Sequence, residues 1–172
     1  LDSIAQHRQI VQGYDFAALP VEANANAILL LRAAGAADAM VKAGAALLAR
    51  DLGPPDALVS EAVPLVASEL APDGRAKAYL QGEKLAKAGS VRAAMAERAA
   101  RTMLDELADP NAAMATFTRV VRDYGSVSGL HAVRAAKVGI GDVWRARGDL
   151  GEGHAAALHG PKSSRSPERR GR

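Results

Sequence analysis

The sequence predicts an all-α protein built from a repeating helix hairpin. Three observations lead to this prediction. The apolar residues, 49% of the 172-residue chain, are mostly Ala and Leu, which favour helices, while aromatic residues are only 3%. Val and Ile are scattered and do not alternate with polar residues, so no strand pattern is present. Gly and Pro recur at intervals that divide the chain into segments of helical length.

The expected elements are set by this punctuation. A first helix is expected over residues 1–12, with a turn after it that ends at Pro20, so residues 1–20 are expected to form an N-terminal cap on the helical domain. The helical domain is then expected over 21–159, with a basic tail over 160–172. Within the domain, helices are expected near 21–34, 36–51, 55–70, 73–88, 90–107, 110–124, 127–147 and 149–158.

The helix boundaries have physical reasons. Asp109 precedes Pro110, which is the order expected of an N-cap residue and a first helical residue. Ser90 and Asp149 are expected to cap their helices in the same way. Glycine tolerates the left-handed conformation that succeeds many helices, so five glycines are expected at helix ends: Gly35, Gly53, Gly89, Gly125 and Gly148.

Pro64 is the exception to this order, because it lies inside a helical pattern. Proline lacks the backbone N–H and its ring clashes with the preceding turn. The helix over 55–70 is therefore expected to kink or split near Val63.

The spacing of the helices indicates a repeat. When the helices are paired as hairpins, the first members begin near 21, 55, 90 and 127, with steps of 34, 35 and 37 residues. A near-constant period of this length is typical of helical repeat arrays. A single hairpin is too small to bury its apolar face alone, so about four hairpins are expected to stack into one continuous core.

Residues 140–150, IGDVWRARGDL, resemble the centre of a tetratricopeptide repeat. The resemblance implies that Gly141 permits close approach of the partner helix, that Trp144 fills the space between the pair, and that Gly148 and Asp149 form the turn and cap. It also implies a right-handed α-solenoid of antiparallel helix hairpins. The sequence departs from the family pattern at Gly153, where the family has Ala.

The preceding hairpin resembles the family in its second half. Ala113 stands where a small packing residue is expected, and Phe117 opens the pattern F-x-x-V-V-x-x-Y, which bacterial members share. Its first helix has Arg101 where the family has Gly. A second register, over residues 80–94, fits the motif one helix out of phase, and a plain helical bundle with Ala-rich helices is the alternative to repeats.

The resemblance also implies a partner-binding groove lined by the first helix of each hairpin. The family's positions fall on Arg98, Thr102 and Asp105 in the third hairpin, and on Val138, Asp142 and Arg145 in the fourth. A weaker alignment adds Ala25, Leu29 and Arg32 from the first hairpin. The Lys and Asn that clamp chaperone C-termini in some members are not reproduced, so a chaperone-tail receptor is not expected.

Catalytic, cofactor and metal sites are not expected. The absence of cysteine excludes disulfides, thiolate metal sites and cysteine nucleophiles. The histidines do not have the spacing of metal ligands, and Gly139 to Gly141 lacks the preceding strand and third glycine of a dinucleotide loop. Adjacent acids such as Asp105 and Glu106 point in different directions from a helix.

We therefore expect a non-catalytic scaffold, or a subunit of a larger assembly, that binds a protein or peptide. The Ala-rich faces also allow self-association. No run approaches the roughly 18 apolar residues of a membrane span. The alternative is association with nucleic acid or an acidic surface through residues 160–172, whose five basic residues and one acid account for more than the chain's net charge of +3. No aromatic residue in that tail can stack on bases, so nucleic acid is the weaker prediction.

Overall fold

The computed structural model describes residues 13–126 and 131–148, and within them it contains helices and no strand. This confirms the predicted all-α class. The helices expected over 1–12 and 149–158, and the tail over 160–172, lie outside the described residues. The elements are the 3-10 helix η1 (Phe16–Ala18) and the α-helices α2 (Val21–Ala33), α3 (Ala37–Leu48), α4 (Asp56–Ser68), α5 (Pro72–Leu85), α6 (Gly89–Asp105), α7 (Pro110–Tyr124) and α8 (His131–Ala146).

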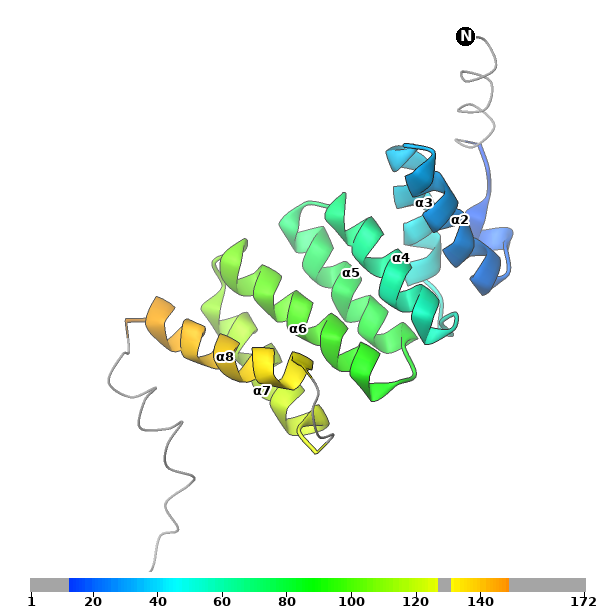
Figure 1. The fold of residues 1–172 in the computed structure, drawn as a ribbon. Coiled ribbons are helices and arrows are strands. Elements are labelled where there is room, and N and C mark those ends of the chain that lie inside the picture. Colours follow the sequence, from blue (N-terminus) through cyan, green and yellow to red (C-terminus); the bar gives the residue numbers. More distant parts are fainter. Residues whose placement is uncertain (1–12, 127–130, 149–172) are drawn as a thin grey trace, which may run out of the picture.

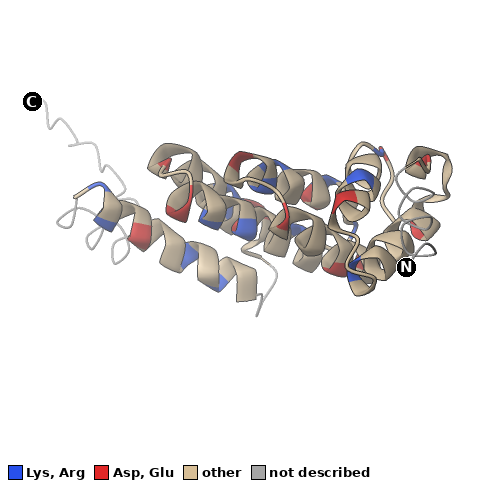
Figure 2. Cartoon of the chain, turned by 90° about the horizontal axis from the view of Figure 1, so that it is seen from above, with Lys and Arg blue, Asp and Glu red and all other residues tan. Residues whose placement is uncertain are grey.

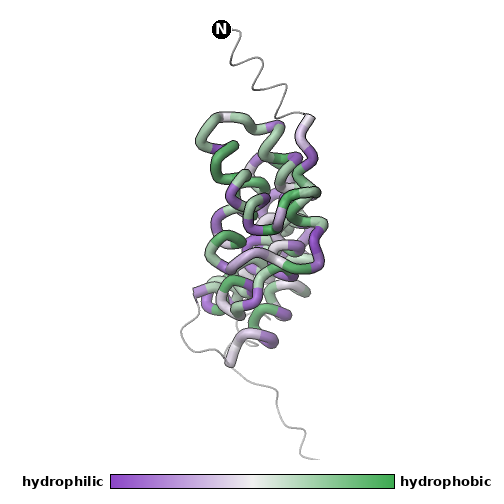
Figure 3. The backbone as a smooth tube through the Cα atoms, turned by 90° about the vertical axis from the view of Figure 1, so that its right-hand side faces the viewer, coloured by the Kyte–Doolittle hydropathy of each residue, from purple (hydrophilic) through white to green (hydrophobic). Residues whose placement is uncertain are grey.

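The helices succeed one another across the molecule in chain order (Figure 1). Each packs against the next helix along the chain, and the even-numbered helices also pack in series, α2 on α4, α4 on α6 and α6 on α8. Apolar and polar segments alternate along the backbone of the row (Figure 3), because each helix buries one face against its neighbours.

The core consists of two clusters of buried side chains. One joins η1 and helices α2 to α5, with Ile28, Met40 and Leu47 among its members, and extends to Met95 of α6. The other is built from α6, α7 and α8 around Phe117. Because α6 contributes side chains to both clusters, it joins the two halves of the described array.

Glycines bring three helix pairs into close contact. A Cβ at Gly44 of α3 would clash with the side chain of Val66 of α4, and one at Gly82 of α5 would lie 2.8 Å from Val63, also on α4. In the second cluster, the Cα of Gly139 on α8 packs directly on the ring of Phe117 on α7. The first two contacts place α4 between α3 and α5 at short range.

Several predicted helix boundaries are confirmed. Gly35 and Gly148 have φ of 67° and 77°, the left-handed conformation expected after a helix. The Asp109 carboxylate accepts hydrogen bonds from the N–H groups of Asn111 (3.1 Å) and Ala112 (2.9 Å), and Pro110 is the first residue of α7.

Other boundary predictions are wrong. Gly89 begins α6 rather than ending α5, and Ser90 is not the N-cap, which is Ala88. The connection before α6 is instead stabilised by a residue far away in the sequence. The Asp56 carboxylate accepts hydrogen bonds from the N–H groups of Lys87 (2.7 Å) and Ala88 (2.9 Å).

Gly53 and Gly125 differ from expectation in their conformation, and Pro64 does not split its helix. Gly53 and Gly125 are not left-handed. Gly125 ends α7 in the right-handed helical region, and Gly53 is required for a different reason, since a Cβ there would meet the carbonyl of Leu85. Helix α4 continues through Pro64 without a split, because a proline removes one intrahelical bond while the apolar face of the helix stays buried on its neighbours.

We expect Ala108→Gly to stabilise the protein. Ala108 is exposed and has φ of 50°, a conformation that costs a residue with a Cβ roughly 1–2 kcal/mol. Glycine loses more entropy on folding, so we expect a net gain of about 0.5–1 kcal/mol in the free energy of unfolding, measured by denaturant titration. The control is Ala49→Gly, where φ is −83° and the same change should lower stability. Equal effects at both positions would contradict the prediction.

Candidate functional site

A surface hollow of about 440 Å³ lies where the C-terminal end of α4 meets α5 and α6. Three of its lining residues, Arg98, Thr102 and Asp105, are groove residues predicted from the sequence. Both signs of charge are equally represented on its walls. The full lining comprises the arginines Arg75, Arg98 and Arg101, the acids Glu97, Asp105 and Glu106, and Ser68, Tyr79 and Thr102.

Arg75 is a structural member of this lining. Its Nε and Nη2 donate to the carbonyl oxygens of Ala67 and Leu70, each at 3.1 Å, at the end of α4. Its Nη1 forms an ion pair with Glu106 at 2.5 Å. An arginine that satisfies terminal helix carbonyls stabilises that end of the helix, so Arg75 and Glu106 are already occupied within the fold.

Arg101 connects the hollow to α8. Its guanidinium bonds Asp142 at 2.7 Å, lies 3.7 Å from Glu97, and stands 5.2 Å from the ring centroid of Phe117. Burial lowers the pKa of Arg101, but the hydrogen bond and charge of Asp142 raise it above its ordinary value. The charges of Glu97 and Asp105 add smaller contributions in the same direction. The charge is therefore permanent, and Arg101 fills the place where the family has glycine.

Arg98 and Asp105 differ from these neighbours. Both are exposed, and among the described residues neither forms an ion pair. The Arg98 guanidinium lies 6.0 Å from the ring centroid of Tyr79, a cation–π contact that leaves its donors free. Between them, Thr102 is buried and lines the hollow, and its hydroxyl donates to the Arg98 carbonyl at 3.0 Å.

The predicted groove residues on α8 are only indirectly part of this site. Asp142 is joined to it through Arg101, and its second oxygen accepts from Arg145 at 2.5 Å. Both oxygens are therefore engaged within the fold. Val138 is 60% exposed, and neither it nor Arg145 lines the hollow.

The weaker alignment of the first hairpin is partly wrong. Ala25 is fully buried in the first core cluster and cannot present its side chain to a partner, because α2 turns this face toward its neighbours. Leu29 is half-buried. Arg32 is exposed and pairs with Glu69 at the end of α4, at 3.0 Å.

The predicted structural residues have mixed outcomes. Ala113 and Phe117 are fully buried, as packing roles require. Gly141 is exposed and no described atom lies within 4 Å of a Cβ built there, while its expected partner helix, with Asp149, lies outside the described residues. Sequence reasoning missed Gly139, which makes the close contact in the described part. Trp144 is half-buried, with the Arg147 guanidinium 5.9 Å from its ring centroid.

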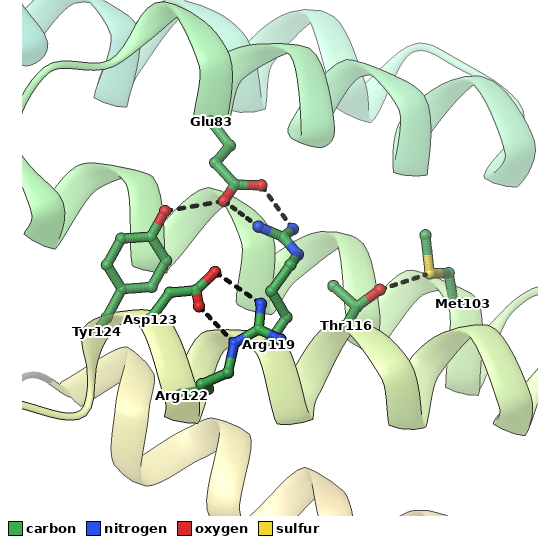
Figure 4. Close-up of polar contacts among 7 residues, drawn as sticks. All are labelled: Glu83, Met103, Thr116, Arg119, Arg122, Asp123 and Tyr124. Carbon is green, nitrogen blue, oxygen red and sulfur yellow. Dashed lines mark hydrogen bonds and ion pairs between the residues drawn. The ribbon is translucent and has the colours of Figure 1, made fainter.

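A second polar cluster, also missed from the sequence, joins α5 to α7 (Figure 4). Glu83 is only 5% exposed, and its two oxygens accept from Arg119 at 2.5 and 2.7 Å and from the Tyr124 hydroxyl at 2.9 Å. The bidentate contact raises the pKa of Arg119, against the effect of burial. All of its partners are satisfied within the fold, so this cluster is structural.

We expect the stability of the protein to fall as the pH rises above 10, with Tyr124 contributing. Burial, then the hydrogen bond and charge of Glu83, raise the pKa of the phenol. The unfolded chain therefore loses this proton first, at about pH 10, and unfolding is favoured as pH rises from there through the folded pKa. Denaturant titrations at successive pH values should show a smaller alkaline decline for Tyr124→Phe than for wild type. Equal declines would contradict this assignment.

The described part of the chain has neither a metal-ligand cluster nor a helix that could span a membrane. No group of three or more His, Cys, Asp or Glu residues there could hold a metal ion. Nor does any helix there have the length and apolar character to cross a membrane. Basic and acidic residues are interspersed along the row of helices (Figure 2), so these helices do not form a face of one sign.

Comparison of the chain with models of protein families, with curated proteins and with solved structures gives no match. The resemblance to tetratricopeptide repeats therefore rests on the residues of the sequence alone.

Proposed function

We propose that this chain is a tetratricopeptide-like α-solenoid that serves as a non-catalytic scaffold, or as a subunit of a larger assembly, by binding a partner peptide or protein in a groove along its even-numbered helices. The helix starts support the repeat, because α2, α4 and α6 begin 35 and then 33 residues apart. The serial contacts of these helices support a stacked array, in which each unit contacts mainly its neighbours.

One observation carries the proposal of a binding groove. The residues that the family pattern assigns to a groove, Arg98, Thr102 and Asp105, line one open hollow, and the two charged ones have no ion-pair partner among the described residues. The other two arginines of the lining, Arg75 and Arg101, are instead paired with Glu106, Glu97 and Asp142. Unpaired opposite charges on a concave surface are suited to a ligand that supplies their partners.

Peptide selection tests this proposal. Random-sequence peptides displayed on phage are selected on the purified chain, and enriched peptides are titrated by fluorescence anisotropy. We expect Arg98→Glu to weaken binding at least tenfold, since it replaces attraction by repulsion. The control is Lys84→Glu, an exposed charge on α5 outside the hollow, which should change affinity less than about twofold. Failure to enrich any peptide, or equal effects of the two variants, would overturn the proposal.

A further inference from the structure

We infer that the preferred ligand is an extended peptide carrying one acidic and one basic side chain three positions apart, with the acid on Arg98 and the base on Asp105. This inference deepens the proposed function and rests on it. Three observations support it: which charged residues of the hollow have no ion-pair partner, how far apart those residues lie, and which repulsive contacts a purely acidic or purely basic ligand would make there.

The free charges define two contact points. Arg75 and Arg101 are held by Glu106, Glu97 and Asp142, so they reinforce the walls and are not available without breaking existing pairs. Arg98 keeps its donors for a carboxylate, which a guanidinium binds with two parallel hydrogen bonds. Asp105 is the last residue of α6, where the helix dipole adds to the attraction for a cation.

The spacing of these points sets the spacing in the ligand. Arg98 and Asp105 are seven residues apart on α6, which places them on one face and roughly 10.5 Å apart along the axis. In a polyproline II peptide, residues i and i+3 point to the same side and are separated by about 9.3 Å. Thr102 lies between the two points along α6 and also lines the hollow.

A ligand of one sign fits poorly. An acidic peptide that pairs with Arg98 would bring its other carboxylates against Asp105 and Glu106, and a basic peptide would meet Arg98 and Arg75. Each such contact costs affinity and excludes that class of partner. The mixed walls therefore disfavour polyanions, nucleic acid included, at this site.

The test uses labelled peptides in a proline-rich frame, with one Glu and one Lys at separations of one, three and five positions in both orders, plus frames with either charge alone. Binding to the full chain is measured by anisotropy at low and at physiological salt. We expect the separation of three, in one order, to bind about two- to fivefold more tightly than the single-charge frames, because one further exposed ion pair contributes up to about 1 kcal/mol.

The decisive variant exchanges the two charges, Arg98→Glu together with Asp105→Arg. Both residues are exposed on the same helix, so the fold should be retained, which circular dichroism checks. We expect this variant to prefer the opposite order of Glu and Lys, also at a separation of three. One outcome separates this inference from the proposed function. If a peptide from the random library binds and Arg98→Glu abolishes that binding, but the designed peptides show no preference for charge order or separation, this inference is overturned and the proposed function stands. If the library yields no peptide that depends on Arg98, both fall.

Discussion

Replacing Arg119 by Met is expected to lower the free energy of unfolding by about 2–3 kcal/mol. The substitution leaves Glu83 almost completely buried, with the Tyr124 hydroxyl as its only remaining partner in the cluster (Figure 4). Removing one member of a buried ion pair costs roughly 3–5 kcal/mol, because the other charge is left without compensation. The side chain of Arg119 is 33% exposed, so water can reach part of the vacated space and reduce the loss.

Two variants make this prediction specific. Glu83→Met combined with Arg119→Met removes both charges, and it should recover most of the stability, since apolar pairs commonly replace buried ion pairs without loss. Arg122→Met, on the same helix, removes an exposed arginine paired only with its neighbour Asp123, and should change stability by less than about 0.5 kcal/mol. Denaturant titration measures all three. A loss in Arg119→Met no greater than in Arg122→Met would show that Glu83 is not effectively buried.

The helical class was predictable because local signals and tertiary packing agree. The signals that predict helices act within a few residues along the chain. Two kinds of them are confirmed: the Asp109 carboxylate caps α7, and Gly35 and Gly148 are left-handed. The start of α6 was not predictable in the same way. Its preceding turn is fixed by Asp56, about 31 residues earlier, and no local pattern around Ser90 reports that contact.

Ion pairs across the array were missed although the sequence contains a signal for them. Glu83 and Arg119 are 36 residues apart, and Arg32 and Glu69 are 37 apart, close to the proposed repeat period. In the proposed repeat, residues one period apart lie on corresponding helices of neighbouring units, which places opposite charges face to face. Pairing charges at the repeat period would have found both contacts before the structure.

The structure brings three of the predicted groove residues together in one hollow and places the others elsewhere. Arg98, Thr102 and Asp105 share one hollow because positions four and three residues apart lie on one helix face. Ala25 was predicted from the repeat period alone, and it is fully buried. An alanine is compatible with either face of a helix, so the sequence does not indicate which face of α2 is buried. Gly139 and Gly141 are two residues apart, and the family motif favoured the second, while the described packing uses the first.

Gly139→Ala is expected to lower the free energy of unfolding by about 2 kcal/mol. The new methyl would stand within 2.6 Å of three ring atoms of Phe117, which is fully buried. Overpacking of this kind costs typically 1–3 kcal/mol, or more, and exceeds the gain of about 1 kcal/mol that Ala brings to a helix. Denaturant titration measures the change. Phe117→Leu in the same chain should relieve the clash, so that the double variant loses less than the sum of the two single variants. Simple additivity would contradict the contact.

Gly141→Ala, two residues further along the same helix, distinguishes two arrangements of the array beyond α8. No described atom lies within 4 Å of the new methyl, so the described helices alone predict a gain of about 1 kcal/mol from helix propensity. The proposed fourth hairpin predicts the opposite sign, because its second helix would pack against Gly141 as the tetratricopeptide resemblance implies. Loss at both glycines would thus support a hairpin that continues beyond Gly148, whereas loss at Gly139 with gain at Gly141 would end the packed array at α8.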